Sequence, residues 1–174
     1  MTNYNIISKK SAHIAIFHDL YVHNFPDCER REWQREVMLL EQDNRFHVVM
    51  ACEDDTPVGF ISYWTFDTFT YIEHLAVYQP HRGRGHGSGL VRHAAASGRY
   101  LLLEVEPPVD DTTRKRIAFY ERLGLVLRPE VDYVQPPYAT GKPSVPLCLM
   151  TTPLMPLDAL HDAVATLKHD VYRA

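Results

Sequence analysis

The feature that most constrains this chain is a segment in which glycine occupies alternate positions from Gly83 to Gly89. It lies between a stretch with strand character and a stretch with helix character. Glycine permits positive φ and close backbone approach, so successive N–H groups can converge on one anion. A helix that begins near His86 adds unpaired N–H donors and the positive end of its dipole, and Arg82 and Arg84 add full charge. The segment therefore predicts an anion-binding loop.

The charge distribution supports a local anion site in an acidic protein. From Gln79 to Arg99 there are four arginines, three histidines and no acidic residue, whereas the other residues carry 14 basic and 22 acidic side chains. The net charge of −4 argues against general nucleic-acid binding. This distribution suits a polyanionic cofactor together with a cationic co-substrate.

Two common phosphate loops do not fit the segment. A Walker loop requires G-x-x-x-x-G-K-[ST], and no lysine occurs between Val58 and Gly98. A dinucleotide-binding fingerprint requires G-x-G-x-x-G, but His86 and Ser88 flank Gly87, so its last glycine is missing. Both classes are disfavoured.

The hydrophobic periodicity predicts one α/β (α+β) domain over residues 1–174. The unit from Thr70 to Glu106 predicts two parallel strands with a right-handed crossover, and antiparallel strands precede it. We expect a mixed, mostly antiparallel sheet with helices on both faces and a C-terminal helix. The expected helices cover about residues 9–22, 29–41 (with Asp27 as a cap), 86–98, 110–124 and 157–171, and the expected strands 46–52, 58–66, 69–77, 100–106 and two segments near Tyr133 and Leu149.

Composition limits the cellular locations and the partners that we expect. No apolar run is long enough to span a bilayer, and the N-terminus lacks a basic region followed by an apolar stretch. Three widely spaced cysteines form neither a disulfide framework nor a zinc spacing. We expect a cytoplasmic protein that is a monomer or homodimer and has no membrane partner. Histidines 81, 86 and 93 lie near the loop, but no pattern indicates that they converge, so no metal site is predicted.

Two motifs together resemble the GNAT superfamily of acetyltransferases. Its acyl-CoA motif, Arg/Gln-x-x-Gly-x-Gly/Ala, is matched by Arg82, Gly85 and Gly87. A later aromatic-Tyr-Glu-x-Leu-Gly motif is matched by the segment from Phe119 to Gly124. The resemblance is clearest from Phe46 to Leu127, and the segments 25–31 and 133–137 resemble a bacterial subgroup whose acceptors are mostly unassigned.

The resemblance implies acetyl-CoA as co-substrate, bound where two parallel strands splay apart. Backbone groups of the first strand would bind the pantetheine arm and donate to the thioester carbonyl. His86 replaces a residue that is usually aliphatic in the family, and Thr113 replaces an asparagine that often contacts the pantetheine. The implied coenzyme-binding residues are Leu75, Ala76, Val77, Arg82, Gly83, Arg84, Gly85, His86, Gly87, Ser88, Thr113 and Phe119.

Three residues are candidates for proton transfer. Tyr120 matches the position of the family's general acid, although its helical spacing also suits a core aromatic. Glu73 and Glu104 interrupt apolar strands, and a partly buried carboxylate with a raised pKa would suit a base acting through water. A solvated sheet face is the structural alternative for both glutamates.

The acceptor side is less specified. The family resemblance places the acceptor pocket among the first two helices and the late strands, where the candidates are Tyr21, Glu29, Trp33, Tyr133 and Tyr138. Each can equally be a packing residue. An acidic protein with aromatic candidates favours a small cationic or amino-acid-like primary amine.

The leading hypothesis is thus an acetyl-CoA-dependent N-acetyltransferase that acts by direct attack through a tetrahedral intermediate. A protein or peptide amine is the alternative acceptor. A non-catalytic acyl-CoA-binding sensor is the alternative from a different functional class. The C-terminal apolar stripe from Leu157 to Val171 would pack on its own sheet or, less favoured, form a dimer contact.

Overall fold

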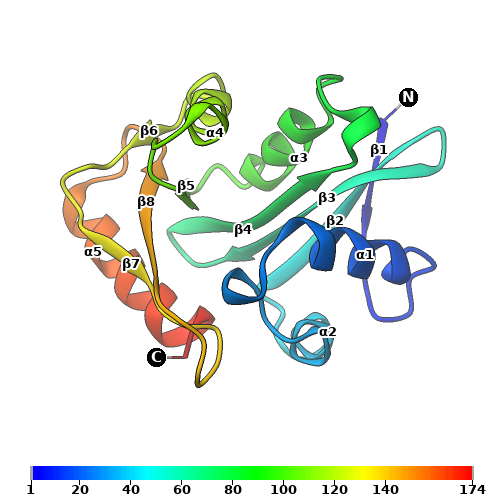
Figure 1. The fold of residues 1–174 in the computed structure, drawn as a ribbon, viewed down its shortest axis with the longest axis horizontal. Helices are drawn as coiled ribbons and strands as arrows, with labels where there is room; N and C mark the ends of the chain where they lie inside the picture. The colour runs from blue at the N-terminus through cyan, green and yellow to red at the C-terminus, as the bar shows by residue number, and fades with distance from the viewer. Residues whose placement is uncertain (1, 174) are drawn as a thin grey trace. The chain divides into compact units, whose positions relative to one another are not determined.

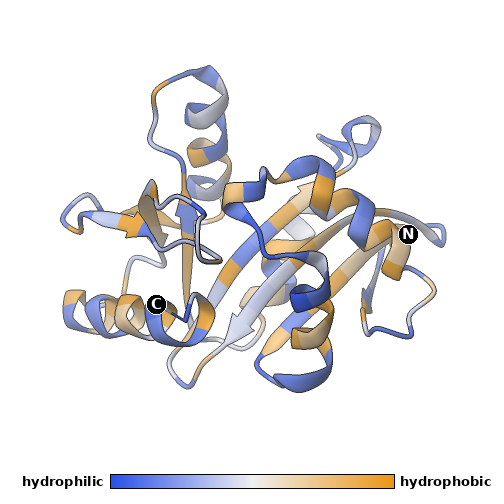
Figure 2. Cartoon of the chain, turned by 60° about the horizontal axis from the view of Figure 1, so that its bottom comes forward, coloured by the Kyte–Doolittle hydropathy of each residue, from blue (hydrophilic) through white to orange (hydrophobic). Residues whose placement is uncertain are grey.

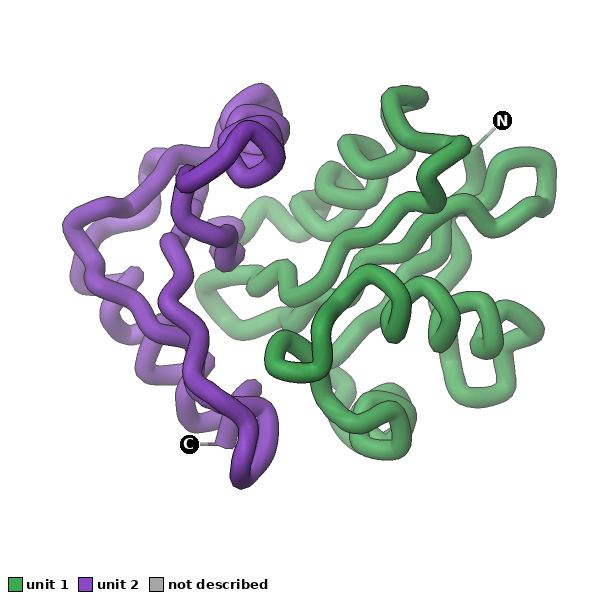
Figure 3. The backbone as a smooth tube through the Cα atoms, in the orientation of Figure 1, with its two compact units in different colours: residues 1–99 green, residues 100–174 purple. Residues whose placement is uncertain are grey.

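The structure is a computed structural model that describes residues 2–173. The chain forms two compact units, residues 1–99 and residues 100–174 (Figure 3). The strands expected to pair in parallel, β4 (Phe69–Val77) and β5 (Tyr100–Val105), belong to different units. Within the described residues, no helix combines the length and apolarity needed to cross a membrane.

The first unit is built on an antiparallel sheet of four strands in the order β1-β2-β3-β4 (Figure 1). Its strands are β1 (Thr2–Ile6), β2 (Phe46–Glu53), β3 (Thr56–Thr65) and β4. The β2–β3 turn has positive φ at Asp54 and Asp55, the backbone conformation that tight hairpins require. Most side chains of β2, β3 and β4 are buried, so these strands form the centre of the unit.

Three α-helices cover this sheet. Figure 1 shows α1 and α2 on one face and α3 on the other. Their bounds, with those of the two short 3-10 turns, are α1 (Ile14–Asn24), η1 (Asp27–Glu29), α2 (Trp33–Gln42), η2 (Gln79–His81) and α3 (His86–Ala95). Phe17 and Leu20 of α1 and Leu90 and Val91 of α3 are buried, so both faces of the sheet carry apolar packing.

In the second unit β8 (Val145–Thr151) is the central strand. It pairs antiparallel with β5, with β6 (Val126–Leu127) and with β7 (Tyr133–Gln135). The helices are α4 (Asp111–Glu121), α5 (Leu157–Thr166) and a π-helical turn, η3 (Leu167–Val171).

The C-terminal helix carries its apolar stripe into the interior. Figure 2 shows hydrophobic and hydrophilic residues interleaved along it, beside the C mark. Leu160, Leu167 and Val171 are buried, whereas Leu157, the first residue of the expected stripe, is 43% exposed. Most of the stripe is therefore covered within the chain, as the packing interpretation expected.

Two expected helix starts are wrong because side chains hold the backbone. The first helix begins at Ile14, five residues later than expected, since the Ser8 amide donates to the Ser11 hydroxyl (2.9 Å) in a local turn. Asp27 lies in a 3-10 turn and caps no α-helix; α2 begins at Trp33. Before it, the Arg31 amide donates to the Tyr21 hydroxyl (2.8 Å).

Strand β4 contains a bulge at Glu73. His74 lies opposite Ser62 and Ile72 lies opposite Tyr63, so Glu73 is an extra residue in the register of β4 against β3. The side chain of Glu73 is 0% exposed although the residue as a whole is half-buried. The exposed part is therefore the main chain, and bulges of this kind recur next to active sites, where they redirect a side chain.

Candidate functional site

The glycine segment forms the loop that leads from β4 into α3. The 3-10 turn η2 follows β4, and Gly83 and Gly85 then adopt φ values of +78° and +87°. Gly85 is the N-cap of α3, so the amides of the following first turn, which includes Gly87 and Ser88, lack helical partners. The structure thus brings the predicted anion-binding backbone groups to one helix N-terminus.

Both loop arginines are held in place by neighbours in the first unit. The Nε of Arg82 donates to the Val77 carbonyl (2.9 Å), and its NH2 donates to Asn24 Oδ1 (3.4 Å). Arg84 donates to Glu53 Oε2 (3.3 Å). Both guanidinium groups remain exposed, so each can also face an anion in solvent.

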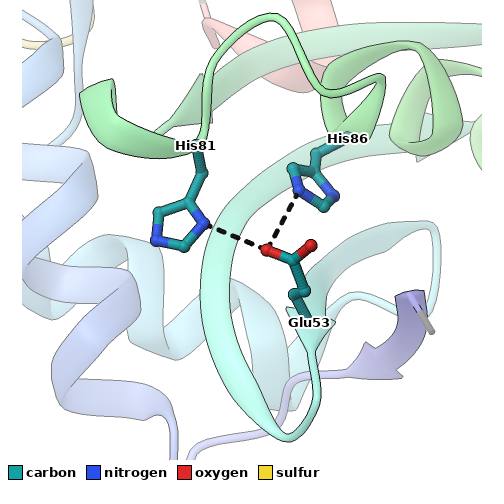
Figure 4. Close-up of side chains that lie close together, drawn as sticks. All are labelled: Glu53, His81 and His86. Carbon is teal, nitrogen blue, oxygen red and sulfur yellow. Dashed lines mark hydrogen bonds and ion pairs between the residues drawn. The ribbon is translucent and has the colours of Figure 1, made fainter.

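His86 differs from the other loop residues because its side chain is buried, at 3% exposure. Its Nε2 lies 3.7 Å from Glu53 Oε2, and His81 Nδ1 lies 3.3 Å from the same oxygen (Figure 4). Two of the three clustered histidines therefore converge on a carboxylate. No sequence pattern indicates this geometry, because Glu53 ends β2, far from the loop along the chain.

Strand β4 places Leu75, Ala76 and Val77 immediately before the loop. Leu75 and Val77 are half-buried and Ala76 is buried, and all three follow the bulge at Glu73. The predicted coenzyme-binding backbone is thus continuous with the predicted anion-binding loop.

The Glu73 carboxylate lies in a buried polar network beneath this strand. Its Oε1 is 2.6 Å from Arg31 NH1, and its Oε2 accepts a hydrogen bond from Trp64 Nε1 (2.8 Å). Glu36 Oε2 lies 3.4 Å from the same Arg31 nitrogen and accepts from the Tyr21 hydroxyl (3.3 Å). One guanidinium therefore faces two buried carboxyl groups.

Glu36 is the group most perturbed by this arrangement. Its pKa is raised from 4.5 to about 7, mainly by burial and in part by the neighbouring Glu73 carboxylate, while Arg31 opposes the change. Among the described residues, its Oε1 is buried with no hydrogen-bond partner. An unpaired buried oxygen disfavours the charged form, in agreement with this direction. Sequence reasoning missed Glu36, although a charge on the apolar face of Trp33 and Leu40 was a usable signal.

His74 is a structural residue in this unit. Burial lowers its pKa, so the ring is neutral. Its Nε2 donates to the Glu29 carbonyl (3.0 Å), and this leaves Nδ1 to accept from the Ser62 hydroxyl (3.2 Å). The predicted acceptor candidate Glu29 therefore contributes a backbone group to the packing of β4.

The other two acceptor candidates of the first unit lie in an aromatic cluster. Tyr21 is 0% exposed and is hydrogen-bonded as described above, and burial raises its pKa well above its ordinary value. Trp33 is half-buried, with ring centroids 5.3 Å from Phe17 and 4.6 Å from His18. Trp33 is thus the more accessible of the two.

In the second unit, helix α4 carries Tyr120, with Phe119 beside it at a ring-centroid distance of 4.9 Å. Burial raises the pKa of Tyr120 to about 12. Thr113 lies in the first turn of α4, where it forms a capping box with Asp110. Its hydroxyl donates to Asp110 Oδ1 (3.0 Å), so in this structure it supports the helix terminus.

Glu104 is the centre of a second cluster, formed with tyrosines. It accepts a short hydrogen bond from Tyr133 and a 2.8 Å hydrogen bond from Tyr172. The Tyr138 and Tyr172 rings lie 4.9 Å apart. The structure thus brings together a predicted base and two predicted acceptor residues. Tyr172, which sequence reasoning missed, joins them from the C-terminal segment, where no motif marks it.

Comparisons with known proteins agree with this architecture. Residues 13–125 match the family model described as "Acetyltransferase (GNAT) family". A solved structure of a candidate GNAT-family acetyltransferase from Bacteroides thetaiotaomicron is 33% identical, with a TM-score of 0.89 and coverage of 99% of both chains. This match confirms the predicted GNAT-like α/β fold class.

Two further matches are partial or more distant. A candidate acetyltransferase of Bacillus subtilis (strain 168), YjbC, is 34% identical over 89 residues, which is 50% of this chain and only 44% of that protein. A GNAT family acetyltransferase from Elizabethkingia anophelis, solved with acetyl-CoA bound, has a TM-score of 0.61 at 12% identity and covers 87% of this chain and 97% of its own. At that identity the likeness shows the fold alone.

Proposed function

Because the chain belongs to the GNAT family of acetyltransferases, we propose that it transfers an acetyl group from acetyl-CoA to the primary amine of an acceptor. We propose that this acceptor is a small cationic or amino-acid-like molecule. The predicted enzyme class, acyltransferase, is the class of this family. The observation that carries the proposal is the loop from Arg82 to Gly87, which presents α3 amides and two anchored arginines at one point.

This loop suits the pyrophosphate of coenzyme A. Free amides of α3, the positive end of its dipole and the arginine charges all favour a multiply charged anion. Arg82 is ordered by the Val77 carbonyl and Asn24, which leave its charge unneutralised. The main chain is exposed at the β4 bulge, which supports a contact between the pantetheine arm and backbone groups. This contact would continue along the strand through Leu75 to Val77. A solved protein of this fold contains acetyl-CoA, consistent with this co-substrate.

We assign Tyr120 the role of proton donor to the leaving sulfur. With a pKa of about 12 its hydroxyl is protonated at neutral pH. Complete transfer to a thiolate with a pKa of about 8.5 would be uphill by roughly 5 kcal/mol. The hydroxyl therefore hydrogen-bonds the sulfur as charge develops on it, and it gives up its proton only as the proton released by the nitrogen is returned to it.

The proton balance is then simple. The neutral amine attacks the thioester carbon and forms a C–N bond, and the C–S bond breaks as the tetrahedral intermediate collapses. The attacking nitrogen loses one proton and the departing sulfur gains one. A base is needed first if the acceptor arrives as an ammonium ion.

Glu104 suits that base better than Glu73. Glu104 is half-buried and linked to tyrosine hydroxyls that can relay a proton. The side chain of Glu73 has no solvent exposure and is ion-paired with Arg31. We assign Glu73 to shaping the β4 bulge, and Glu104 to proton abstraction.

As acceptor candidates we retain Trp33 in the first unit and, separately, Tyr133 and Tyr138 in the second, since each is an aromatic group that can face a cation. Tyr21 and Glu29 act through packing instead, since one is completely buried and the other offers its carbonyl to His74. A cationic amine also suits the acidic composition outside the loop.

A thiol-release assay with acetyl-CoA and a panel of small amines, amino acids and peptides tests the proposal. We expect turnover with at least one small cationic amine, and a loss of about 100-fold or more in kcat for Tyr120→Phe. Tyr63→Phe is the matched control, because it removes the hydroxyl of a half-buried tyrosine to which no role in the site is assigned. Equal turnover by Tyr120→Phe and wild type would remove the proton-donor role.

The same panel distinguishes the alternatives. Turnover confined to peptides with a free N-terminus would favour a protein or peptide acceptor. Saturable acetyl-CoA binding in calorimetry without thiol release from any amine would favour a non-catalytic sensor.

A further inference from the structure

We propose that Glu53, His81 and His86 bind one divalent transition-metal ion of the zinc class beside the phosphate loop. Two imidazoles and one carboxylate form a borderline ligand set, which suits zinc, cobalt or nickel better than magnesium or calcium. The proposal does not depend on the acetyl-transfer chemistry. It revises our sequence-based expectation of no metal site, which rested on the lack of any sign of convergence.

The ligand atoms have the spacing of a metal site. In a tetrahedral site with bonds of about 2.1 Å, adjacent ligand atoms lie roughly 3.4 Å apart. Glu53 Oε2 is 3.3 Å from His81 Nδ1 and 3.7 Å from His86 Nε2, and the three ligand atoms all lie within 4.8 Å of one another (Figure 4). A small rotation of the half-buried His81 side chain closes the remaining gap.

The second observation is an unpaired buried nitrogen that points into the cluster. Among the described residues, His86 Nε2 is buried and has no hydrogen-bond partner. On the other side of the ring, Nδ1 lies 3.5 Å from the Thr2 hydroxyl, which can accept a hydrogen bond from an Nδ1–H group. That tautomer turns the Nε2 lone pair toward the Glu53 carboxylate, where a bound cation would satisfy both groups.

The three ligands come from positions that hold them near one another. Glu53 ends β2, His81 ends η2 and His86 begins α3. The side chains of Glu53 and His81 are 34% and 27% exposed, so an ion can enter from solvent and keep water in its open position. This is the arrangement of three protein ligands with one open site.

The positive charges near the three ligands do not prevent a cation from binding there. Arg84 lies 3.3 Å from Glu53 Oε2, but its side chain is 55% exposed and can turn away. The α3 dipole acts on a cation much more weakly than metal–ligand bonds do, and its effect is confined to the first turn of the helix. The competing explanation is a metal-free cluster in which the two histidines pair directly with Glu53.

Metal titration of tag-free, chelator-treated full-length protein separates the two explanations. We expect calorimetry with Zn²⁺ alone to give one saturable site per chain, and Co²⁺ alone to give visible d–d bands of a low-coordinate site. His86→Leu and Glu53→Gln should each weaken Zn²⁺ binding by about 100-fold or more and abolish the Co²⁺ bands. His169→Gln is the control, because its side chain is 87% exposed and lies in the second unit.

Circular dichroism checks that each variant is folded, and His81→Gln repeats the test at a half-buried ligand whose loss leaves the α3 packing intact. Absence of a saturable Zn²⁺ site in the wild type would overturn the proposal. So would Zn²⁺ affinities and Co²⁺ spectra that are the same for His86→Leu, His81→Gln and His169→Gln.

Discussion

Replacing Glu36 by glutamine tests whether the buried network contains a carboxyl group that folds in its protonated form. Glu36 has no exposed surface, faces the Glu73 carboxylate across a shared Arg31, and has an unpaired Oε1 among the described residues. Glutamine has nearly the same shape and cannot ionise. The substitution therefore removes the titration and leaves the packing.

The magnitude follows from the pKa change. The folded-state pKa is about 7 against an ordinary 4.5, so the folded protein holds this proton more tightly than the unfolded chain does. The contribution to the free energy of unfolding is therefore fully present below pH 4.5 and is lost as the pH rises toward 7. At about 1.36 kcal/mol per pKa unit, the loss from this one group is about 3 kcal/mol.

The measurement is urea unfolding of wild type and Glu36→Gln at about pH 5 and pH 8, both away from the isoelectric point of about 6.2. Relative to wild type, the variant should gain about 2–3 kcal/mol in free energy of unfolding between the two pH values. The exposed Glu32→Gln is the control and should show no such gain. A wild-type-to-variant difference that is equal at both pH values would refute the reasoning.

Three further predictions concern the loop, the two glutamates and the sheet. Arg82→Ala should weaken acetyl-CoA binding by about 10-fold or more and reduce its salt dependence, measured by calorimetry at two salt concentrations, because a charge-assisted hydrogen bond is lost. Glu104→Gln should mainly lower kcat and shift the acid limb of the pH–rate profile. Glu73→Gln should mainly lower the free energy of unfolding, by about 3 kcal/mol, because it breaks a buried ion pair. The reverse pattern would exchange the roles of the two glutamates. Gly59→Ala should cost about 1–3 kcal/mol in urea unfolding, because its Cβ would lie 2.6 Å from the Ala76 carbonyl oxygen, and a neutral result would contradict that close packing.

The sequence predicts the central elements well where side chains alone determine them. The expected strand 69–77 coincides with β4, and the strand expected at 46–52 is one residue shorter than β2. Both are dominated by buried residues, so their patterns are strong. The loop before α3 was also predictable, because its positive-φ positions require glycine.

The N-terminal strand β1 escaped prediction for the opposite reason. Four of its five residues are exposed, so it has no alternating apolar pattern. It forms because its backbone pairs with β2, from Thr2 opposite Glu53 to Ile6 opposite Val49. Pairing of this kind depends on a neighbour that is distant in sequence, and local periodicity does not report it.

The polar network was predictable only in fragments. Glu73 was noticed because it interrupts an apolar strand, but nothing local shows that a bulge turns its carboxylate toward Arg31. Glu36 and Arg31 come from a different part of the chain, and their roles depend on three elements that meet beneath β4. The sequence therefore identifies Glu73 as one of two candidate bases, and its ion pair with Arg31 is the reason that we propose a supporting role for it.

The surroundings of the two loop arginines imply that they do not contribute equally to anion binding. Arg82 is oriented by neutral acceptors, the Val77 carbonyl and Asn24, so its full charge remains available and little side-chain entropy is lost on binding. Arg84 is paired with Glu53, and an anion must compete with that carboxylate for its guanidinium. A cation bound to Glu53 would remove this competition and release Arg84 toward the coenzyme. Glu53 thus makes the phosphate affinity of the loop depend on what else Glu53 binds. A loop that contained only glycines and arginines would not have this dependence.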